Sequence, residues 1–232
     1  MKVGILLIAT NKYNSFVLPV IESIERYFLP NIEKKFYLFT DKPEYYAGRK
    51  TNIYTTLIPS YKFPYATLYR YKIFSENANF IFDCEYLFYL DVDMKVVSEV
   101  NEEILKPLIA VQHPGYITGW GSPNNNPKSK SHLALHERKQ YVAGGFQGGR
   151  YAEYLSICKI LAENIAKDEK AGIMAEWHDE THWNWYVNKA IFDFTILNPS
   201  YCYPEGAHWK QKLSMFTPKI LALEKNHNEI RK

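Results

Sequence analysis

Two aspartates, Asp91 and Asp93, follow an apolar run at 86–90 and are separated by one residue. The run predicts a buried strand, and side chains at positions i and i+2 of a strand point to the same side. We therefore expect a strand over 86–93 that brings both carboxylates together at its carboxyl end. Two carboxylates that close repel unless a cation lies between them. Oxygen ligands suit a hard divalent ion, and such ions often accompany a diphosphate.

The D-x-D triplet has two other interpretations. One is a solvated turn after a buried strand. The other is a phosphatase site in which the first aspartate is the nucleophile. In that phosphatase family the triplet lies near the N-terminus and runs into a Gly-Thr turn. Here it lies mid-chain and continues as Met-Lys-Val-Val over 94–97, a pattern that predicts more strand, so the phosphatase interpretation is disfavoured.

A second acidic pair, Asp179 and Glu180, follows Trp177 and opens the expected helix 180–189. An acid at a helix N-terminus is stabilised by the helix dipole, so a structural role is open. Consecutive helical residues diverge by about 100°. One carboxylate can therefore hold a ligand hydroxyl while the other faces a reacting carbon. The indole of Trp177 offers an apolar face to a sugar.

The segment YVAGGFQGG, residues 141–149, contains four glycines and predicts either a tight turn or a pocket wall that lets a bulky ligand touch the backbone. Its spacing is not G-x-G-x-x-G, which disfavours a dinucleotide site. His113 precedes Pro-Gly-Tyr at the end of an expected strand. It is either a hydrogen-bonded loop residue or a contact to a ligand hydroxyl.

Expected strands and helices alternate along the chain, which favours a single α/β domain with a mostly parallel twisted sheet flanked by helices. Ligands of such sheets bind beyond the carboxyl ends of the strands. The polar segments 117–131 and 224–232 are predicted to be mobile loops. Strands are expected over 3–9, 35–40, 51–58, 86–93, 108–113, 192–197 and 219–223, and helices over 16–28, 67–77, 151–166 and 180–189.

Length and composition narrow the function further. The 232 residues suit one domain, and 16% aromatic content suits a core with a stacking cleft. A net charge of +3 is too small to indicate nucleic acid but favours an anionic ligand. Cys84, Cys158 and Cys202 lack metal-site spacing, so reduced thiols and a cytoplasmic location are expected. The apolar run at 3–8 is too short for a signal peptide or transmembrane segment.

The order and spacing of these motifs resemble glycosyltransferase family 6, the retaining α-1,3-galactosyl- and N-acetylgalactosaminyltransferases that include the human ABO blood-group enzymes. The resemblance implies a GT-A fold, a UDP-sugar donor and transfer with retention of anomeric configuration. Many bacterial relatives lack the D-x-D that this chain keeps, so Mn²⁺ (or Mg²⁺) is the implied cofactor. The matching segments are GILLIATNKY, FTDKP, LDVDM, HPGY, HERK, YVAGGFQGG, WHDETHWNWY, LNPSYCYPEG and LEKNHNEIR.

The resemblance also implies a role for each matching residue. Asp91 and Asp93 match the metal ligands, and Glu180 matches the proposed nucleophile. The implied acceptor-binding residues are His113, Trp177 and Glu180 itself. The implied donor-binding residues are Ile8, Ala9, Thr10, Tyr13, Arg70, Val92, Ala143, Gly144, Gly145, Asp179, Lys225 and Arg231.

The implied substrates are a UDP-sugar donor and a galactose-containing oligosaccharide that accepts the sugar on its 3-hydroxyl. Small side chains at Ala143 and Gly145 leave room for an N-acetyl group and favour UDP-GalNAc over UDP-Gal. A donor-binding half of about 1–112, an acceptor and catalytic half of about 113–223 and a basic tail at 224–232 are expected. The membrane anchor of the animal enzymes is not matched, so a soluble form is expected.

Three alternatives stay open at this point. The chain could be specific for UDP-Gal, or it could invert the anomeric configuration with Glu180 as a base. It could also bind sugars without catalysis, although a binding module has no need for the full set of matched acids and tail cations. The loop after His113 and the apolar Leu135 depart from the family pattern and leave the acceptor open.

Overall fold

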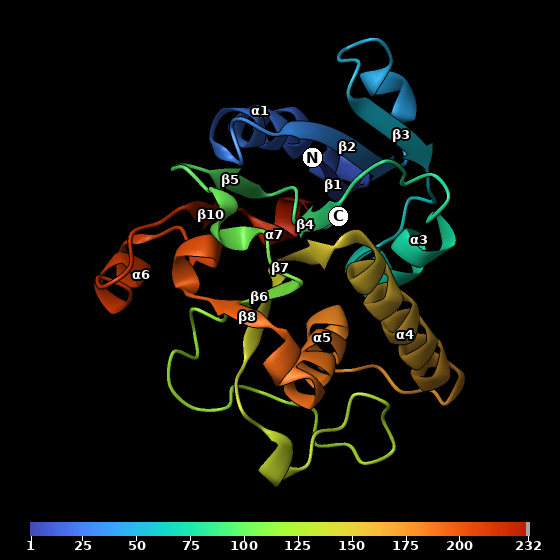
Figure 1. Cartoon of the computed structure of the whole chain (residues 1–232). Helices are drawn as coiled ribbons and strands as arrows, with labels where there is room; N and C mark the ends of the chain where they lie inside the picture. The colour runs from blue at the N-terminus through green and yellow to red at the C-terminus, as the bar shows by residue number, and fades with distance from the viewer. Residues whose placement is uncertain (231–232) are drawn as a thin grey trace.

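The computed structural model describes residues 1–230, which form one α/β domain (Figure 1). The main sheet contains, in spatial order, β3 (Ile53–Leu57), β2 (Glu33–Thr40), β1 (Lys2–Ala9), β4 (Tyr86–Leu90), β7 (Val142–Arg150), β6 (Leu108–Gln112) and β8 (Thr195–Leu197). A small second sheet contains β5 (Met94–Val96), β10 (Ile220–Ala222) and β9 (Tyr203–Pro204).

Helices cover both faces of the main sheet. The α-helices are α1 (Val17–Tyr27), α2 (Tyr65–Leu68), α3 (Arg70–Glu76), α4 (Tyr151–Lys170), α5 (His178–Lys189), α6 (Ala207–Lys212) and α7 (His227–Ile230). The 3₁₀ helices are Asn11–Phe16, Pro43–Tyr46, Glu102–Ile104, Leu135–Glu137, Ile191–Asp193 and Pro199–Cys202. Two hydrophobic cores result, one between the sheet and α1 and the other between the sheet and α3, α4 and α5 (Figure 1).

The predicted mostly parallel sheet is confirmed. β3, β2, β1 and β4 run parallel to one another, and β6 is parallel to β8. β1 is buried at every position after Lys2, as expected for a strand covered on both faces. Only β7 runs antiparallel to its neighbours in this sheet, between β4 and β6.

The expected strand over 86–93 is wrong at its carboxyl end. β4 stops at Leu90, and a turn follows in which the Met94 N–H donates to the Asp91 carbonyl at 3.1 Å. The chain then enters β5, which pairs with β10 in the second sheet rather than extending β4. The two aspartates therefore lie at the point where the chain changes sheets. Their relative orientation is set by this turn and not by strand alternation.

The glycine-rich segment 141–149 was expected to form a turn or pocket wall, but most of it forms the nine-residue strand β7. Glycine is depleted in strands, which hid the strand from the sequence pattern. The reason for glycine here is close approach to β4. A Cβ on Gly148 would lie 2.3 Å from the Leu87 carbonyl oxygen, well inside van der Waals contact.

The remaining expectations differ from the structure mainly at their ends. The helix predicted over 67–77 is divided between α2 and α3, and the one predicted over 151–166 continues to Lys170. The first half of the strand predicted over 192–197 lies mostly in a 3₁₀ turn. Segment 117–131 contains no helix or strand, as expected, whereas the tail includes the short helix α7.

Phe28 ties α1 to the central strands, so its removal tests the first core. Its ring is fully buried and packs edge-on against Phe88 and Phe146, with centroids 5.5 and 5.9 Å away. We expect Phe28→Ala to lower the free energy of unfolding by about 3–5 kcal/mol in chemical denaturation. The matched control is Phe192→Ala, whose ring is 93% exposed; it should cost less than about 1 kcal/mol. Equal losses for the two variants would contradict this packing.

Candidate active site

A cavity of about 400 Å³ opens at the carboxyl ends of β1 and β4. Its wall is formed by Ile8, Thr10, Asn11, Tyr13, Ser60, Tyr61, Lys62, Phe63, Ala66, Thr67, Tyr89, Asp91, Val92, Asp93, Lys225 and Ile230. The predicted donor and metal residues on this wall are Ile8, Thr10, Tyr13, Asp91, Val92, Asp93 and Lys225. The cavity therefore lies where ligands of parallel sheets bind.

Asp91 is anchored on one carboxylate oxygen. Its Oδ1 accepts a short hydrogen bond from the Tyr89 hydroxyl and lies 3.3 Å from Arg70 Nη2. Its Oδ2 lies only 3.2 Å from where a Cβ on Gly145 would be. A side chain at position 145 would therefore crowd the second oxygen, and glycine avoids this contact.

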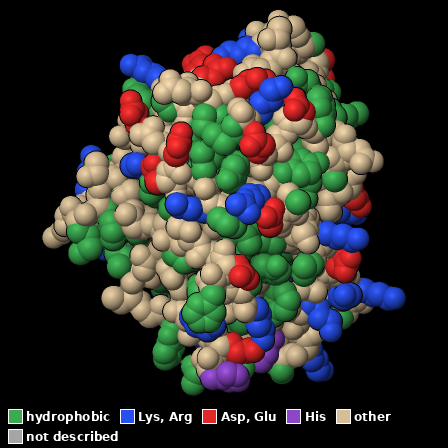
Figure 2. Space-filling model, viewed as in Figure 1, with side chains coloured by type: hydrophobic (Ala, Val, Ile, Leu, Met, Phe, Trp, Pro, Cys, Tyr) green, Lys and Arg blue, Asp and Glu red, His purple; other side chains and the backbone are tan. Residues whose placement is uncertain are grey.

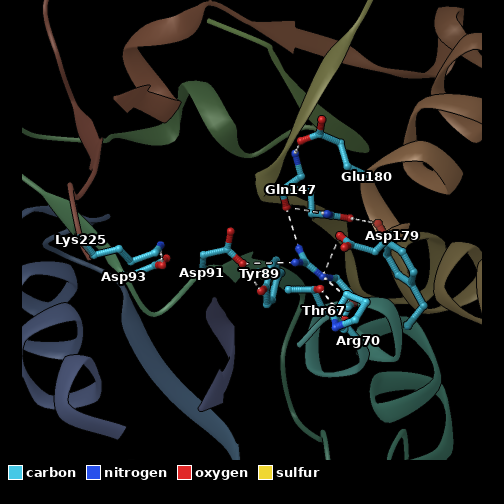
Figure 3. A network of polar contacts seen from close by, with 12 residues as sticks. Thr67, Arg70, Tyr89, Asp91, Asp93, Gln147, Asp179, Glu180 and Lys225 are labelled. Atoms are coloured by element: carbon cyan, nitrogen blue, oxygen red, sulfur yellow. Dashed lines mark hydrogen bonds and ion pairs between the residues drawn. The ribbon is translucent and has the colours of Figure 1, made fainter. Parts of the chain in front are cut away.

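Asp93 pairs with the C-terminal tail. The Lys225 ammonium forms an ion pair with Asp93 Oδ2 and lies 5.8 Å from the ring centroid of Tyr13 (Figure 3). Lys12 Nζ donates to the Glu229 carbonyl at 2.8 Å, which holds the tail against the start of the domain. The tail thus places Lys225, a predicted donor-binding residue, on the cavity wall, whereas Arg231 lies outside the described residues.

Asp91 and Asp93 are the residues that fit a divalent cation. Within residues 1–230 no three His, Cys, Asp or Glu side chains are placed to hold an ion together. The two aspartates therefore provide a partial ligand set, which is typical of Mg²⁺-type ions that take one or two carboxylates and complete their shell with phosphate oxygens and water. The oxygen-only donor set suits that arrangement.

Arg70 was predicted to bind the donor, but it lies 2% exposed behind the cavity wall. Its Nε lies 3.1 Å from Asp179 Oδ2, and its Nη1 donates to the Gly144 carbonyl at 2.8 Å. With the contact to Asp91, the guanidinium bridges three segments of the chain (Figure 3). Burial lowers the pKa of Arg70, but the carboxylates of Asp179 and Asp91 raise it above its ordinary value overall.

Asp179 and Glu180 lie in the first turn of α5 and face different partners, as helical geometry predicts. Asp179 pairs with Arg70, whereas Glu180 Oε2 accepts the Gly144 N–H at 2.9 Å. Burial raises the pKa of Asp179 to about 6, although Arg70 opposes the shift. Burial also raises the pKa of Glu180 to about 7, against the lowering effect of the Gly144 N–H.

Two asparagines that the sequence patterns did not indicate hold α5 against the start of β7 and the residues just before it. Asn184 donates to the Val142 carbonyl and accepts its N–H, both at 2.7 Å, and Asn188 Nδ2 donates to the Gln140 carbonyl at 2.8 Å. Both side chains are buried. Glu180, Asn184 and Asn188 are spaced four residues apart and so share one helix face. That polar stripe on a buried helix was the signal available in the sequence.

The small residues of β7 occupy different positions around the carboxylates. A Cβ on Gly144 would meet Asp179 and Glu180 at 3.4 Å, and one on Gly145 would meet Asp91. Ala143 is 3% exposed and belongs to the first core, as does the predicted uridine-lining residue Ala9. Gly144 and Gly145 are thus brought to the acids, whereas Ala143 and Ala9 lie beneath the site.

His113 lies on the Glu180 side of the site. Its Nδ1 accepts the Gly115 N–H at 2.9 Å, and its ring packs against Tyr116 and Tyr141. Burial, followed by the nearby Lys212 charge, lowers the pKa of His113 to about 4, so the ring is neutral at pH 7. Because Nδ1 accepts a hydrogen bond, the ring proton lies on Nε2. The Tyr141 hydroxyl is a hydrogen-bond partner of Glu180 and lowers its pKa. The indole of Trp177 is 48% exposed at the start of α5.

Comparison with known proteins places the chain in a family. The model of glycosyltransferase family 6 matches residues 1–232. The chain belongs to glycosyltransferase family 6. It is 31% identical to the histo-blood group ABO system transferase 1 of Rattus norvegicus, over 99% of this chain and 68% of the relative. It is 27% identical to the O-antigen biosynthesis glycosyltransferase WbnI of Escherichia coli, over 88% and 89%, and 25% identical to globoside alpha-1,3-N-acetylgalactosaminyltransferase 1 of Gallus gallus, over 100% and 69%.

As a family 6 glycosyltransferase, the protein is an enzyme, and its sheet and flanking helices agree with the expected GT-A-like fold. None of the helices described in the structure is both long and apolar enough to cross a membrane. All three cysteines are free. On the face in Figure 2, basic and acidic side chains are interspersed, unlike the continuous basic stripe of nucleic-acid-binding proteins.

The raised pKa of Glu180 predicts a stability change with pH. A carboxylate with a pKa near 7 in the folded protein, against an ordinary value of 4.5, binds its proton more tightly when folded. Its contribution is therefore fully favourable below pH 4 and is lost as the pH rises through about 7. We expect Glu180→Gln to unfold at a higher temperature than the unsubstituted protein at pH 8, but not at pH 4.

The matched control for this measurement is Glu22→Gln on the exposed face of α1. It should change the melting temperature little at either pH. A Glu180→Gln variant that gains the same stability at both pH values, or none at pH 8, would contradict the burial of an ionisable Glu180.

Proposed function

We propose that this protein is a metal-dependent retaining glycosyltransferase that moves GalNAc from UDP-GalNAc to the 3-hydroxyl of a galactose-containing acceptor, forming an α-1,3 linkage. The observation that carries the proposal is the connection of the cavity acid Asp91, through the buried Arg70 and the Gly144 backbone, to the Glu180 carboxylate. The cavity wall proposed to bind the diphosphate is thus joined by one polar network to a carboxylate whose pKa is raised. The name of the chicken relative, an alpha-1,3-N-acetylgalactosaminyltransferase, supports this donor sugar and linkage.

The donor is expected to bind with its nucleotide in the cavity. Tyr61 and Tyr13 provide flat faces for a base, and the cavity wall leads from them to Asp91 and Asp93. Lys225 offers a positive charge for the diphosphate once it moves from Asp93 to a phosphate oxygen. A bound divalent cation would neutralise the charge that develops on the leaving UDP.

Glu180 is the residue that best suits the reacting sugar carbon. The Gly144 N–H holds its carboxylate. The next residue of β7, Gly145, faces the other way and adjoins Asp91. With a pKa near 7 it is partly ionised at neutral pH, so it can act as a nucleophile or stabilise an oxocarbenium-like transition state. Asp179 beside it is held by Arg70 and is suited to accept a hydrogen bond from a sugar hydroxyl.

The acceptor is expected to approach from the His113 side. The neutral imidazole donates through Nε2, because its Nδ1 is occupied by Gly115. Trp177 offers an exposed indole face on which a galactose ring can stack. Gly145 lacks a side chain next to Asp91 and the buried Ala143 beneath the site is small; together they are expected to leave space for the N-acetyl group of the donor, which favours UDP-GalNAc over UDP-Gal.

A transfer assay with four donors tests the proposal directly. With a galactose-containing acceptor, we expect UDP-GalNAc to react faster than UDP-Gal, UDP-Glc and UDP-GlcNAc. The anomeric proton coupling of the product should be that of an α linkage. Glu180→Gln should reduce the rate by on the order of 10²-fold or more, because the acid next to the reacting carbon is lost, whereas UDP binding should be retained.

The control in this assay is again Glu22→Gln, which should transfer at the unsubstituted rate. A strong preference for UDP-Gal would contradict the assigned effect of Ala143 and Gly145. A β-linked product would contradict retention, and a Glu180→Gln variant with the normal rate would remove Glu180 from the reaction.

Metal dependence is checked by the affinity for UDP alone. We expect Mn²⁺ to tighten UDP binding by about tenfold or more in titration calorimetry, because the cation links the aspartates to the diphosphate. The double variant Asp91→Asn, Asp93→Asn should lose this gain, and chelation should stop transfer by the unsubstituted enzyme. Asp193→Asn, at an exposed site, is the control and should keep the full effect of Mn²⁺. Transfer at an unchanged rate in excess chelator would exclude the metal.

A further inference from the structure

Gln147 is a polar side chain that the proposed reaction leaves without a role. It is completely buried in the second core, where an apolar residue would be expected. Its Nε2 donates to the Gly144 carbonyl at 2.9 Å, and its Oε1 lies 3.2 Å from the Tyr71 hydroxyl and 3.3 Å from the Tyr154 hydroxyl. Both polar atoms of the amide group thus have hydrogen-bond partners in the interior. One of these partners is the carbonyl of Gly144, whose N–H binds Glu180 (Figure 3).

An irregularity in β7 explains why the Gly144 carbonyl needs side-chain donors. Val111 pairs with Ala143 and Ile109 with Gly148, so two steps along β6 correspond to five along β7. The intervening β7 residues bulge away from β6, and a buried carbonyl without a partner would be costly. Arg70 and Gln147 both donate to this carbonyl.

The same bulge decides which side chains share a face. Gly145 adjoins Met94 and Cys202 of the first core, and Phe146 also packs into that core, so strand alternation fails between these two residues. Gly144 and Gln147 consequently both face the second core and α5, although they are three residues apart. Without the bulge, Gln147 would point away from Gly144.

We propose that Gln147 is a positioning residue that fixes the Gly144 backbone, so that the Gly144 N–H holds the Glu180 carboxylate in place. Gly144 is held on both sides, with its carbonyl bound by Arg70 and Gln147 and its N–H bound to Glu180. The functional consequence rests on the proposed role of Glu180. The hydrogen-bond geometry does not depend on that role, and it can be tested separately.

Several groups act on Glu180 from the elements packed around it. Asp179 on α5 raises its pKa, whereas Tyr141 before β7 and Arg70 on α3 lower it. Cys202, from the first core, also interacts with it. Among these influences the Gly144 N–H is the largest that favours the charged form. Gln147 acts on Glu180 through that N–H alone.

The test is Gln147→Met, which keeps the volume but removes the amide. We expect the pKa of Glu180 to rise by about one unit, as for loss of one hydrogen bond to a charged group. The pKa is followed by carbon NMR of side-chain-labelled glutamate, with the Glu180 signal assigned by its loss in Glu180→Gln. The transfer rate should fall several-fold more at pH 6 than at pH 8, because a smaller fraction of Glu180 is ionised at the lower pH, while the affinity for UDP stays within about twofold.

The control is Phe28→Leu, which loosens the other core without touching Gly144. It should lower stability but leave the pKa of Glu180 and the shape of the pH profile unchanged. If Gln147→Met leaves the pKa of Glu180 unchanged and lowers the transfer rate equally at pH 6 and pH 8, the positioning role is overturned. If the unsubstituted protein transfers no sugar but the pKa of Glu180 still rises in Gln147→Met, the proposed function fails and the positioning role stands.

A second variant provides the test if Gln147→Met does not fold. The double variant Tyr71→Phe, Tyr154→Phe removes both hydroxyls that hold the Gln147 amide and leaves Gly144 and Gln147 themselves intact. A rise in the pKa of Glu180 in this variant supports the positioning role, and an unchanged pKa overturns it.

Discussion

The Arg70 guanidinium, buried between Asp91 and Asp179, is the interaction on which the site depends. A buried charge is costly unless paired and hydrogen-bonded, and Arg70 is satisfied only because α5, the turn after β4 and the Gly144 carbonyl converge on it. The planar guanidinium presents several donors in fixed directions, which a lysine could not. Packing of α3 against α4 and the sheet therefore sets the separation between the metal-type acids and Glu180.

The acids of the site lie in surroundings that do not favour their charges. Burial raises the pKa of both Asp179 and Glu180, and neutral donors from β7 and Tyr141 only partly offset this for Glu180. Such a site reduces the stability of the folded protein at neutral pH. The two large hydrophobic cores and the hydrogen bonds of Asn184 to β7 offset this loss of stability. A carboxylate that titrates near neutrality is useful for chemistry at a sugar carbon.

The end of β4 and the bulge in β7 are two interruptions of regular sheet at the same place. Where β4 stops, Asp91 and Asp93 enter a turn and the chain moves to the second sheet. Where β7 leaves β6, Gly144 exposes both its N–H and its carbonyl to side chains. Regular strands would have used these backbone groups in ladder hydrogen bonds. The irregularities therefore supply the polar groups from which the site is built, and the tail residue Lys225 adds a cation to the cavity wall.

The sequence by itself determined the class of fold, the mostly parallel sheet and the family, because apolar runs of strand length, helical periodicity and the order of short motifs are all local properties. It also singled out Asp91, Asp93 and Glu180 by residue type and Lys225 through the family resemblance; the structure places Asp91, Asp93 and Lys225 on one cavity wall and Glu180 on the Gly144 N–H nearby. It did not reveal β7, since glycines placed for close approach to β4 look like a turn. It assigned Arg70 to the donor, whereas tertiary packing buries the side chain behind the cavity. The roles of Gln147 and of the turn at Asp91 were decided only by the tertiary structure, because a bulge and a change of sheet depend on which strands are neighbours.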